Sequence, residues 1–361
     1  MDAVAVTLTC WSREPHLSQI YTGLTMLHRR GLIRLQQKIV RLSTSALNAK
    51  QWHCRIEAAG RHYYVDTHDS PELDQEGLRD CDVYLKRILT GTHPKVRPLG
   101  LNYAVRADGF DGFEAQRRMK IRGVASQAED LRQGPLPASA LEGVPLEGEI
   151  ISPRVLFVCR TSEPNEQDPI QDQDRIAIDE MHADIIFALR KAFGRRCIAG
   201  FDPTPHAIRT YREALLEVDL SDQRRYLEAV QAASICVTTA GPNGSDSWQL
   251  GQYVAAHRAI VSAPLPYDAP NFHSGIHYLP FSTPQACVEQ AGILMESSWA
   301  SQQISTANAV YYHQHLRPDM LVADAIELST HSGSVAKVAD RNRVIPPEAR
   351  ELPLGAGGHA A

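Results

Sequence analysis

The sequence predicts an α/β protein with two domains, the second of which contains a parallel sheet. The chain has 361 residues, more than a single hydrophobic core usually serves, and 43% of them are hydrophobic. In the second half, short apolar segments alternate with segments of helical pattern, which is typical of parallel strands joined by crossover helices. Residues 127–153 are rich in Pro, Gly, Ser and Glu, as linkers are. We therefore expect domains at residues 1–150 and 151–330.

The first domain is expected to be mixed α/β. Its apolar pattern predicts a buried strand, a helix that ends at Gly31, two strands around Gly60 and one further strand. In chain order these elements lie within residues 3–10, 17–31, 52–70 and 81–89. The segment 32–42 ("LIRLQQKIVRL") fits either a strand or a helix.

The second domain alternates regularly between the two element types. The expected strands cover residues 154–160, 196–201, 234–239 and 259–265. The expected helices cover residues 173–193, 208–216 and 223–233, a segment that ends near 257, and two or three helices between 284 and 330. Ser221 with Asp222 is the expected N-cap of the third helix. Residues 331–361, rich in Gly, Ala and Pro, are expected to form a disordered tail.

The composition excludes several classes of protein. A net charge of −5 disfavours a nucleic-acid partner, because phosphate backbones select basic surfaces. No apolar run approaches eighteen residues and the N-terminus lacks the pattern of a signal peptide, so we expect a cytoplasmic protein. The seven cysteines are scattered, and several lie in apolar segments, which indicates buried reduced thiols. We expect no metal site and no bound cofactor, since metal ligands do not cluster.

The loop that follows the strand 234–239 is a candidate anion site. In parallel sheets ligands bind beyond the carboxyl ends of the strands, and the N–H groups of a following helix attract anions. Glycines allow a ligand to approach the backbone, and serines can cap the helix. The candidate binding residues are Gly241, Asn243, Gly244, Ser245 and Ser247. The alternative is a capped turn that binds nothing, and the carboxylate of Asp246 would repel a phosphate.

Arg160 is a second candidate at the same edge, because it follows the apolar strand "VLFVC". A guanidinium group can form two hydrogen bonds with a diphosphate. The alternative is a solvated surface arginine, but its position beside the 241–247 loop favours a shared anion site.

These residues carry a resemblance to a known family. The second half resembles the donor domain of GT-B glycosyltransferases, which use nucleotide sugars, and in particular bacterial family-1-type members. The resemblance covers residues 154–325, and in the first half only "YYVDTHDSPE" and "DVYLKR". It implies two Rossmann-like domains facing a central cleft, with the donor diphosphate at Arg160 and the 241–247 loop. The matching segments are "VLFVCRTSEPNEQDP", "AGFDPTPHAIRTYREAL", "YLEAVQAASICVTT", "GPNGSDSWQLGQYVAA" and "AIVSAPLPYDAP".

The chain also departs from the family pattern. Many retaining members have two glutamates eight positions apart, and Gly244 and Gln252 occupy these places here. The resemblance implies that Gln252 lies near the nucleotide ribose, which its amide can still contact as donor and acceptor. His257 and Ala259 occupy places where the family usually has Gly and Pro.

The first half contributes the candidate catalytic residues. Asp66, His68 and Asp69 follow the expected strand "RHYYV", and a histidine beside carboxylates can accept a hydroxyl proton near neutral pH. The alternative is a turn with Asp69 or Ser70 as the N-cap of a helix in "PELDQEGL".

Two basic residues follow the next expected strand. Lys86 and Arg87 come after "DVY" and are candidate contacts for the donor phosphates. The alternative is a solvated strand end.

The resemblance thus implies a glycosyltransferase of polysaccharide or natural-product biosynthesis. It would move a sugar from a nucleotide diphosphate sugar to a hydroxyl of a glycan, a lipid-linked acceptor or a small molecule, without a metal. The alternatives are a non-catalytic nucleotide-sugar-binding or scaffold relative and a nucleotide-sugar epimerase. Basic residues gather within 29–41 and 117–122, which suits either peripheral contact with the inner membrane face or ordinary solvated surfaces.

Overall fold

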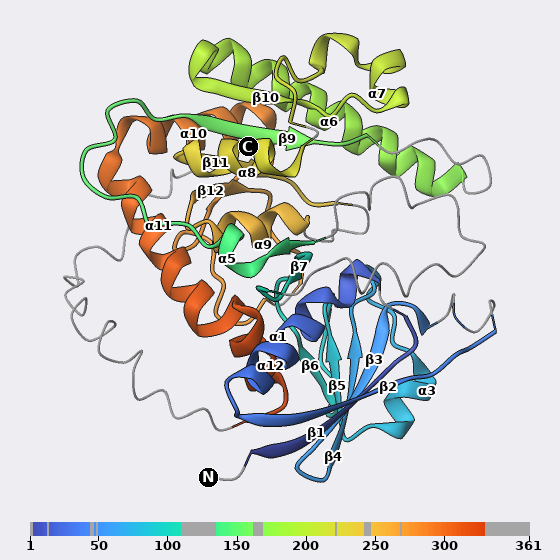
Figure 1. The fold of residues 1–361 in the computed structure, drawn as a ribbon. Helices are drawn as coiled ribbons and strands as arrows, with labels where there is room; N and C mark the ends of the chain where they lie inside the picture. Colours follow the sequence, from blue (N-terminus) through green and yellow to red (C-terminus); the bar gives the residue numbers. More distant parts are fainter. Residues whose placement is uncertain are drawn as a thin grey trace, which may run out of the picture. The chain divides into compact units, whose positions relative to one another are not determined.

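A computed structural model provides the three-dimensional structure of the chain (Figure 1). It describes residues 3–328 except 13, 44–46, 48–49, 110–134, 162–168, 221, 242–246 and 268, and it describes residues 169–172 without their side chains. Met1–Glu327 forms one compact unit with a six-stranded and a five-stranded sheet. The expected tail, residues 331–361, lies outside the described residues, and the domain boundary near residue 150 stays a prediction.

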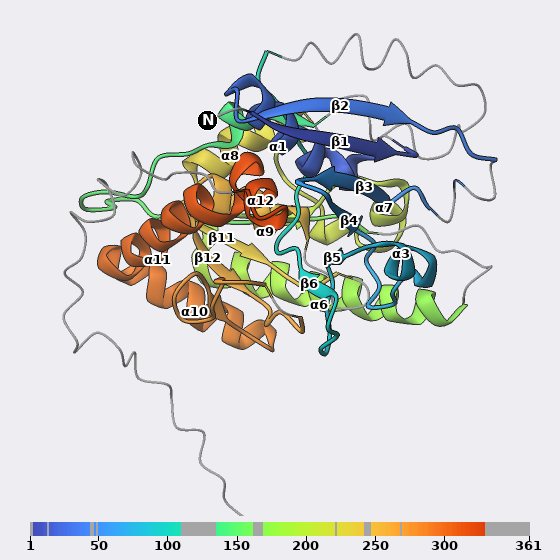
Figure 2. The same cartoon turned by 90° about the horizontal axis from the view of Figure 1, so that it is seen from below.

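The first sheet is mixed, with the strand order β2-β1-β3-β4-β5-β6 (Figure 2). Its strands are β1 (Val4–Cys10), β2 (Ile33–Ile39), β3 (His53–Ala58), β4 (Arg61–Asp66), β5 (Val83–Lys86) and β6 (Val96–Pro98). The ambiguous segment 32–42 therefore contains a strand, which pairs in parallel with β1. The strands β4, β5 and β6 are parallel to one another, so the carboxyl ends of β4 and β5 are neighbours.

The helices of this half differ from the prediction at one place. The remaining elements are a 3-10 turn (Pro15–Leu17), α1 (Ser18–Arg29), α3 (Gln75–Asp80), β7 (Val105–Arg106), β8 (Leu136–Pro137) and α5 (Ala138–Leu141). The helix expected in "PELDQEGL" begins only at Gln75, and its N-cap is Asp74 rather than Asp69 or Ser70. The Asp74 carboxylate accepts hydrogen bonds from the backbone N–H groups of Glu76 and Gly77. The segment that contains Asp69 is thus not a helix cap.

The second sheet is parallel throughout and confirms the predicted α/β alternation. Its order is β10-β9-β11-β12-β13, with β9 (Val155–Cys159), β10 (Cys197–Phe201), β11 (Ile235–Thr238), β12 (Ala259–Ser262) and β13 (Leu279–Pro280). The helices are α6 (Pro169–Phe193), α7 (Pro205–Thr210), α8 (Gln223–Ala232), α9 (Trp248–Ala255), α10 (Pro284–Glu296), α11 (Ser298–Tyr311) and α12 (Pro318–Ala325). Short 3-10 turns at Gly194–Arg196 and Arg212–Ala214 and a π turn at Tyr312–Leu316 complete the described elements.

One expected helix of the second half is shorter than its pattern suggests. Residues 208–216 were expected to be helical, but α7 ends at Thr210. The chain then returns to the sheet, where the backbone N–H of Leu216 donates to the carbonyl of Phe201 over 2.9 Å. This hydrogen bond to the sheet prevents the helix from continuing to residue 216. A contact between distant segments of the chain cannot be predicted from the local sequence.

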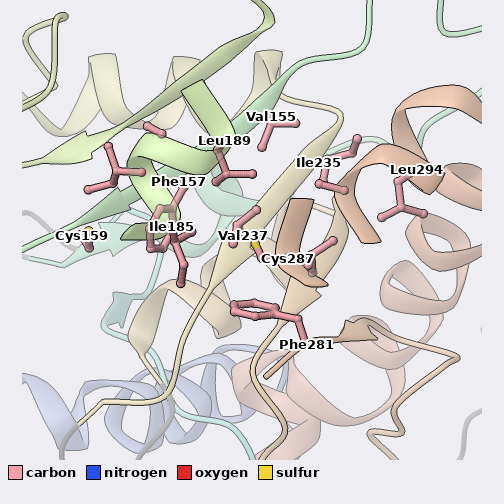
Figure 3. Close-up of a cluster of buried hydrophobic side chains, with 14 of the residues drawn as sticks. Val155, Phe157, Cys159, Ile185, Leu189, Ile235, Val237, Phe281, Cys287 and Leu294 are labelled. Atoms are coloured by element: carbon pink, nitrogen blue, oxygen red, sulfur yellow. The ribbon is translucent and has the colours of Figure 1, made fainter. Parts of the chain in front are cut away.

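The core of the second half lies between the sheet and two helices (Figure 3). Val155, Phe157 and Cys159 alternate along β9 toward Ile185 of α6 and Leu294 of α10. The intervening residues of β9 are also buried, so both faces of this sheet are covered. All seven cysteines are free, and six of them are buried, as the sequence predicts.

The helix α12 returns to the first sheet and packs against α1 (Figures 1 and 2). Gly23 of α1 allows the close approach, because a Cβ atom there would lie 2.1 Å from the carbonyl oxygen of Pro318. The fully buried carboxylate of Asp319 binds Arg30 of the segment that follows α1 and Arg317 beside it. Of the helices in the described ranges, none combines the length and the apolar character needed to cross a bilayer.

We expect Asp319→Ala to lower the free energy of unfolding by about 3 kcal/mol, because charge-assisted hydrogen bonds to a buried carboxylate are lost. The matched control is Asp80→Ala, which removes the exposed ion pair with Arg55 and should cost about 1 kcal/mol or less. Chemical denaturation of the two variants measures both values. Equal losses of unfolding free energy in the two variants would show that the ion pairs of Asp319 with Arg30 and Arg317 do not stabilise the packing of α12.

Candidate functional site

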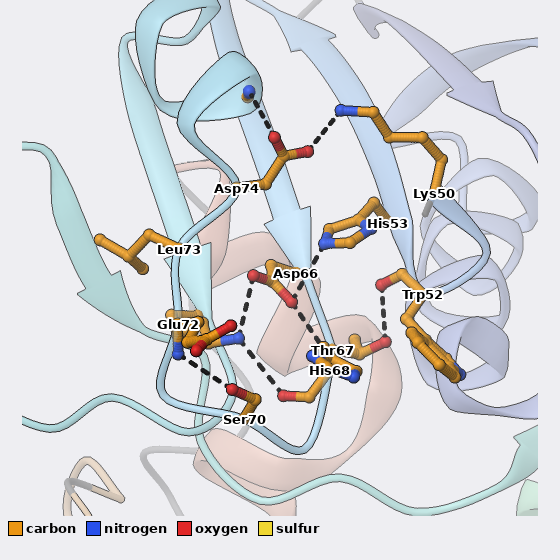
Figure 4. A network of polar contacts seen from close by, with 12 residues as sticks. Lys50, Trp52, His53, Asp66, Thr67, His68, Ser70, Glu72, Leu73 and Asp74 are labelled. Atoms are coloured by element: carbon orange, nitrogen blue, oxygen red, sulfur yellow. Dashed lines mark hydrogen bonds and ion pairs between the residues drawn. The ribbon is translucent and has the colours of Figure 1, made fainter. Parts of the chain in front are cut away.

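The ends of β4 and β5 carry a buried ion pair. Figure 4 shows its carboxylate, Asp66, with the neighbouring His53, Thr67 and His68. Asp66 and Lys86 are register partners, and Lys86 Nζ lies 2.9 Å from Asp66 Oδ2. Their side chains are 1% and 0% exposed. The hydroxyl of Tyr84 donates to the same oxygen, and Nε2 of His53 lies 3.4 Å from Oδ1. Burial alone would raise the pKa of Asp66, but the hydrogen bond from His53 and the charge of Lys86 hold it below its ordinary value.

This ion pair holds the backbone of His68 from two sides. The His68 N–H donates to Asp66 Oδ1 over 2.9 Å, and Lys86 Nζ donates to the His68 carbonyl over 3.3 Å. Thr67 donates from its N–H and its hydroxyl to the carbonyl of Trp52. The partly buried His68 ring stacks on Trp52, with ring centres 4.4 Å apart. Burial lowers the pKa of His68, so the ring is neutral near pH 7 and can accept a proton.

A second ion pair and a second histidine lie beside His68. Asp69, whose side chain is 40% exposed, pairs with the buried guanidinium of Arg87. Burial lowers the pKa of His16 to about 4, the charge of Asp69 opposes this shift, and Arg87 and His68 add to it. The His16 ring centre lies 4.8 Å from that of Trp248, the first residue of α9.

Three residues of this cluster are not among the candidates that the sequence predicts. His16 follows β1, and ligands in such sheets bind beyond the carboxyl ends of the strands. The same expectation that indicates Arg160 could therefore have indicated His16. Trp52 and His53 lie at the start of the antiparallel strand β3, and only the pairing of β3 with β4 brings them to this edge of the sheet. The two strands expected around Gly60 form this hairpin, so its turn at Ala59 and Gly60 is the local signal that could have found both residues.

The second sheet has a topological switch point between β9 and β11. The chain passes from β9 to β10 on one side and later to β11 on the other side of β9. Loops that leave the sheet in opposite directions form a crevice at such a point. Arg160 directly follows β9, and Gly241 lies in the segment after β11. Arg160 is half-exposed, and its Nε lies 3.7 Å from Oδ2 of Asp202, which follows β10.

The helix α9 begins next to this switch point. Ser247 is its N-cap, with Oγ accepting from the N–H of Gln249 over 3.0 Å, in agreement with the expectation that a serine of this loop caps the helix. The side chain of Gln249 donates to the carbonyl of Val158 over 2.8 Å and ties the helix start to β9. Gln252 Oε1 accepts a hydrogen bond from Tyr226 over 3.1 Å. Ligand contacts of Gln252 stay a prediction.

The structure thus groups the candidate residues at two sheet edges. Asp66, His68, Asp69, Lys86 and Arg87 lie together at the first, and Arg160, Gly241, Ser247 and Gln252 follow strands of the second. Asn243, Gly244 and Ser245 lie outside the described residues. Within the ranges that the structure describes, no three His, Cys, Asp or Glu side chains are placed to hold a metal ion.

Comparison with known proteins finds similar solved structures. No protein-family model and no curated protein matches the chain. A glycosyltransferase from Rickettsia africae has a TM-score of 0.44 and 8% identity, over 91% of this chain and 98% of that one. HepE from Anabaena, solved with UDP and glucose, has a TM-score of 0.42 and 9% identity, over 88% and 98%. A putative UDP-N-acetylglucosamine 2-epimerase from Listeria monocytogenes has a TM-score of 0.35 and 9% identity, over 82% and 72%.

The structural matches include glycosyltransferases, the proteins that the sequence resembles. The fold class expected from that resemblance, α/β with two sheets of Rossmann-like type, agrees with the observed architecture. The TM-scores are below 0.5, so the chemistry of the site has to be interpreted from its own residues.

Buried neutral histidines should make stability depend on pH. Burial lowers the pKa of His16, His182, His257 and His277 to about 4. Between about pH 6.5 and pH 4 the unfolded chain binds protons that the folded chain does not, so stability falls as the pH falls. The slope is at most about 1.4 kcal/mol per pH unit for each histidine. Urea unfolding at pH 7, 6 and 5 measures it.

The variant His277→Gln removes one of these groups and should make the slope shallower. A stability that does not change between pH 7 and pH 5 would contradict the prediction, because it would mean that the histidines titrate alike in both states.

Proposed function

We propose that the chain is a glycosyltransferase that moves a sugar from a nucleotide diphosphate sugar to an acceptor hydroxyl without a metal. One observation carries the proposal: the contact between His16 and Trp248. His16 belongs to the imidazole and carboxylate cluster of the first sheet, and Trp248 begins the helix beside the switch point of the second. A candidate base and a candidate anion site are therefore adjacent.

The donor side of the proposal is electrostatic. A diphosphate leaving group develops negative charge when its bond to the sugar breaks. Arg160 offers a guanidinium group at the switch point, and the start of α9 adds the positive end of a helix dipole. These groups stabilise the leaving diphosphate in place of a metal.

The acceptor side is proton transfer to His68. The oxygen of the acceptor hydroxyl bonds to the anomeric carbon, and the bond from that carbon to the diphosphate oxygen breaks. The nucleoside diphosphate leaves with the electron pair, and the hydroxyl proton passes to the imidazole of His68. Asp66 and Lys86 act as positioning residues, since both are buried, paired and bonded to the His68 backbone. Arg87 and Asp69 add paired charges beside the ring.

The proposal also includes the class of acceptor and the location of the reaction. The proposed acceptor is a glycan, a lipid-linked acceptor or a small molecule in polysaccharide or natural-product biosynthesis, and the proposed location is the cytoplasm. Within 29–41, Arg30 pairs with Asp319 and Arg29 donates to the carbonyl of Asp108, so two of the five cations serve folding contacts. This favours an ordinary solvated surface over membrane contact for that segment.

A non-catalytic nucleotide-sugar-binding protein is the second candidate. Gly244 and Gln252 replace the two glutamates of the resembling family, and the Gln252 amide already accepts a hydrogen bond from Tyr226. Binding of a nucleoside diphosphate without donor turnover would select this candidate. Conversion of the donor sugar without any acceptor would instead select an epimerase.

We expect Arg160→Ala to weaken the binding of a nucleoside diphosphate by roughly ten- to a hundredfold, because a charge-assisted hydrogen bond is worth about 1.5–3 kcal/mol. Calorimetry with UDP, GDP, dTDP and ADP first identifies the base and then measures the loss. The control is Arg225→Ala, which removes an exposed arginine of α8 that pairs with Asp219. A folded Arg160→Ala protein with unchanged affinity would remove Arg160 from the site.

We expect His68→Gln to reduce donor turnover about 10²- to 10⁴-fold and to leave nucleoside diphosphate affinity unchanged, because a general base acts on the acceptor proton. Turnover is measured with an acceptor that supports the wild-type reaction. His62→Gln, at the exposed opposite end of β4, should keep wild-type turnover. Full turnover in His68→Gln would show that another group takes the proton.

A further inference from the structure

The helix α6 places a buried histidine under the carboxyl end of β11. His182 is 7% exposed, and its Nε2 lies 2.6 Å from Oγ1 of Thr239. The rings of Phe157 and Phe201 pack against the imidazole, with ring centres 5.8 and 6.2 Å away. Thr239 follows the last residue of β11 and therefore lies at the switch point. This pair has no part in the proposed mechanism.

The surroundings of His182 determine which ring nitrogen carries the proton. Burial lowers the pKa of His182 to about 4, so the ring is neutral at pH 7 and has one N–H. The other nitrogen, Nδ1, is buried and has no hydrogen-bond partner among the residues that the structure describes. A proton on Nδ1 would leave a buried N–H without an acceptor, which is rare and costly. A proton on Nε2 is donated to Thr239 Oγ1 and leaves only an unshared lone pair in the core.

This tautomer directs the hydroxyl of Thr239. Its oxygen accepts from His182, so its own proton has to be donated to a different group. Within the described part of the chain, His182 is the side-chain hydrogen-bond partner of this hydroxyl. Thr239 keeps 8% of its surface exposed at the sheet edge. The hydroxyl of the preceding residue, Oγ1 of Thr238, is buried and lacks a hydrogen-bond partner among the described residues. Hydroxyl groups that can still donate a hydrogen bond at a strand end are suited to binding a ligand with many oxygen atoms.

We infer that His182 is a positioning residue that makes Thr239 a hydrogen-bond donor to the diphosphate of the donor substrate. The inference rests on the proposed function and names a further contact of its anion site. It is independent of Arg160, which follows a different strand of the same sheet.

The experiment measures diphosphate affinity and the tautomer separately. Calorimetry uses inorganic pyrophosphate and the nucleoside diphosphate that the wild type binds best among UDP, GDP, dTDP and ADP. Thr239→Val should weaken binding roughly ten- to a hundredfold, as expected for a lost hydrogen bond to a charged acceptor. Thr239→Ser, which keeps the hydroxyl, should recover most of the affinity. In ¹⁵N NMR spectra at pH 7, His182 should carry its proton on Nε2.

Variants of His182 test the coupling. His182→Phe should also lose affinity, but no more than Thr239→Val, and the double variant should lose no more than Thr239→Val alone, because both act through one hydroxyl. His182→Gln can keep a donor near the position of Nε2 and should retain part of the affinity. Thr25→Val removes a hydroxyl from α1, where it donates to the carbonyl of Tyr21, and should leave affinity unchanged.

The outcomes separate this inference from the proposed function. If Arg160→Ala weakens binding but folded Thr239→Val does not, the inference is wrong and the proposed function stands. A proton on Nδ1 of His182, or lowered thermal stability of the variants with unchanged affinity, also overturns the inference. If the wild type binds neither pyrophosphate nor any of the four nucleotides, both fall.

Discussion

The buried ion pair between Lys86 and Asp66 is the interaction on which the first candidate site depends. It joins the last residues of two neighbouring parallel strands. Two charges that leave water lose several kcal/mol of hydration each, so such a pair adds little net stability unless further hydrogen bonds satisfy it. Here the carboxylate also accepts from Tyr84 and from the backbone of His68, and the ammonium group donates to the carbonyl of His68. The result is a fixed position for that residue.

The residues that follow the buried ion pair along the two strands make further contacts closer to the surface. His68 stacks on Trp52, and the carbonyl of Trp52 is held by Thr67, the residue between Asp66 and His68. One residue further, Asp69 meets Arg87, which directly follows Lys86. Two adjacent strand ends thus supply a buried pair that positions the backbone and a partly exposed pair that charges the surface. The neutral imidazole of His68 lies between them in the sequence.

Much of the architecture could be predicted because its cause is local. The alternation of apolar and helical segments predicts the parallel sheet, and polar residues after apolar strands indicate Asp66, His68, Asp69, Lys86 and Arg87. The strand β2 could not be distinguished from a helix, since only its pairing with β1 decides it. The two strands around Gly60 could be predicted, but the register of their hairpin, which places His53 opposite Asp66, does not enter that prediction, so Trp52 and His53 are not among the candidates. The catalytic and binding roles of the candidate residues stay predictions.

The two sheets differ in how they hold a basic side chain at a strand end, Lys86 in the first and Arg160 in the second. Lys86 is fully buried at 2.9 Å from its carboxylate, so a change of partner would leave a buried charge uncompensated. Arg160 is 52% exposed and lies 3.7 Å from Asp202. An exposed pair at that distance is worth about 1 kcal/mol or less. The ion pair between Arg160 and Asp202 therefore costs little to break, whereas breaking the pair between Asp66 and Lys86 would leave a buried charge uncompensated. The ion pair of the first sheet thus fixes the backbone of His68, whereas that of the second sheet leaves the guanidinium group of Arg160 half-exposed.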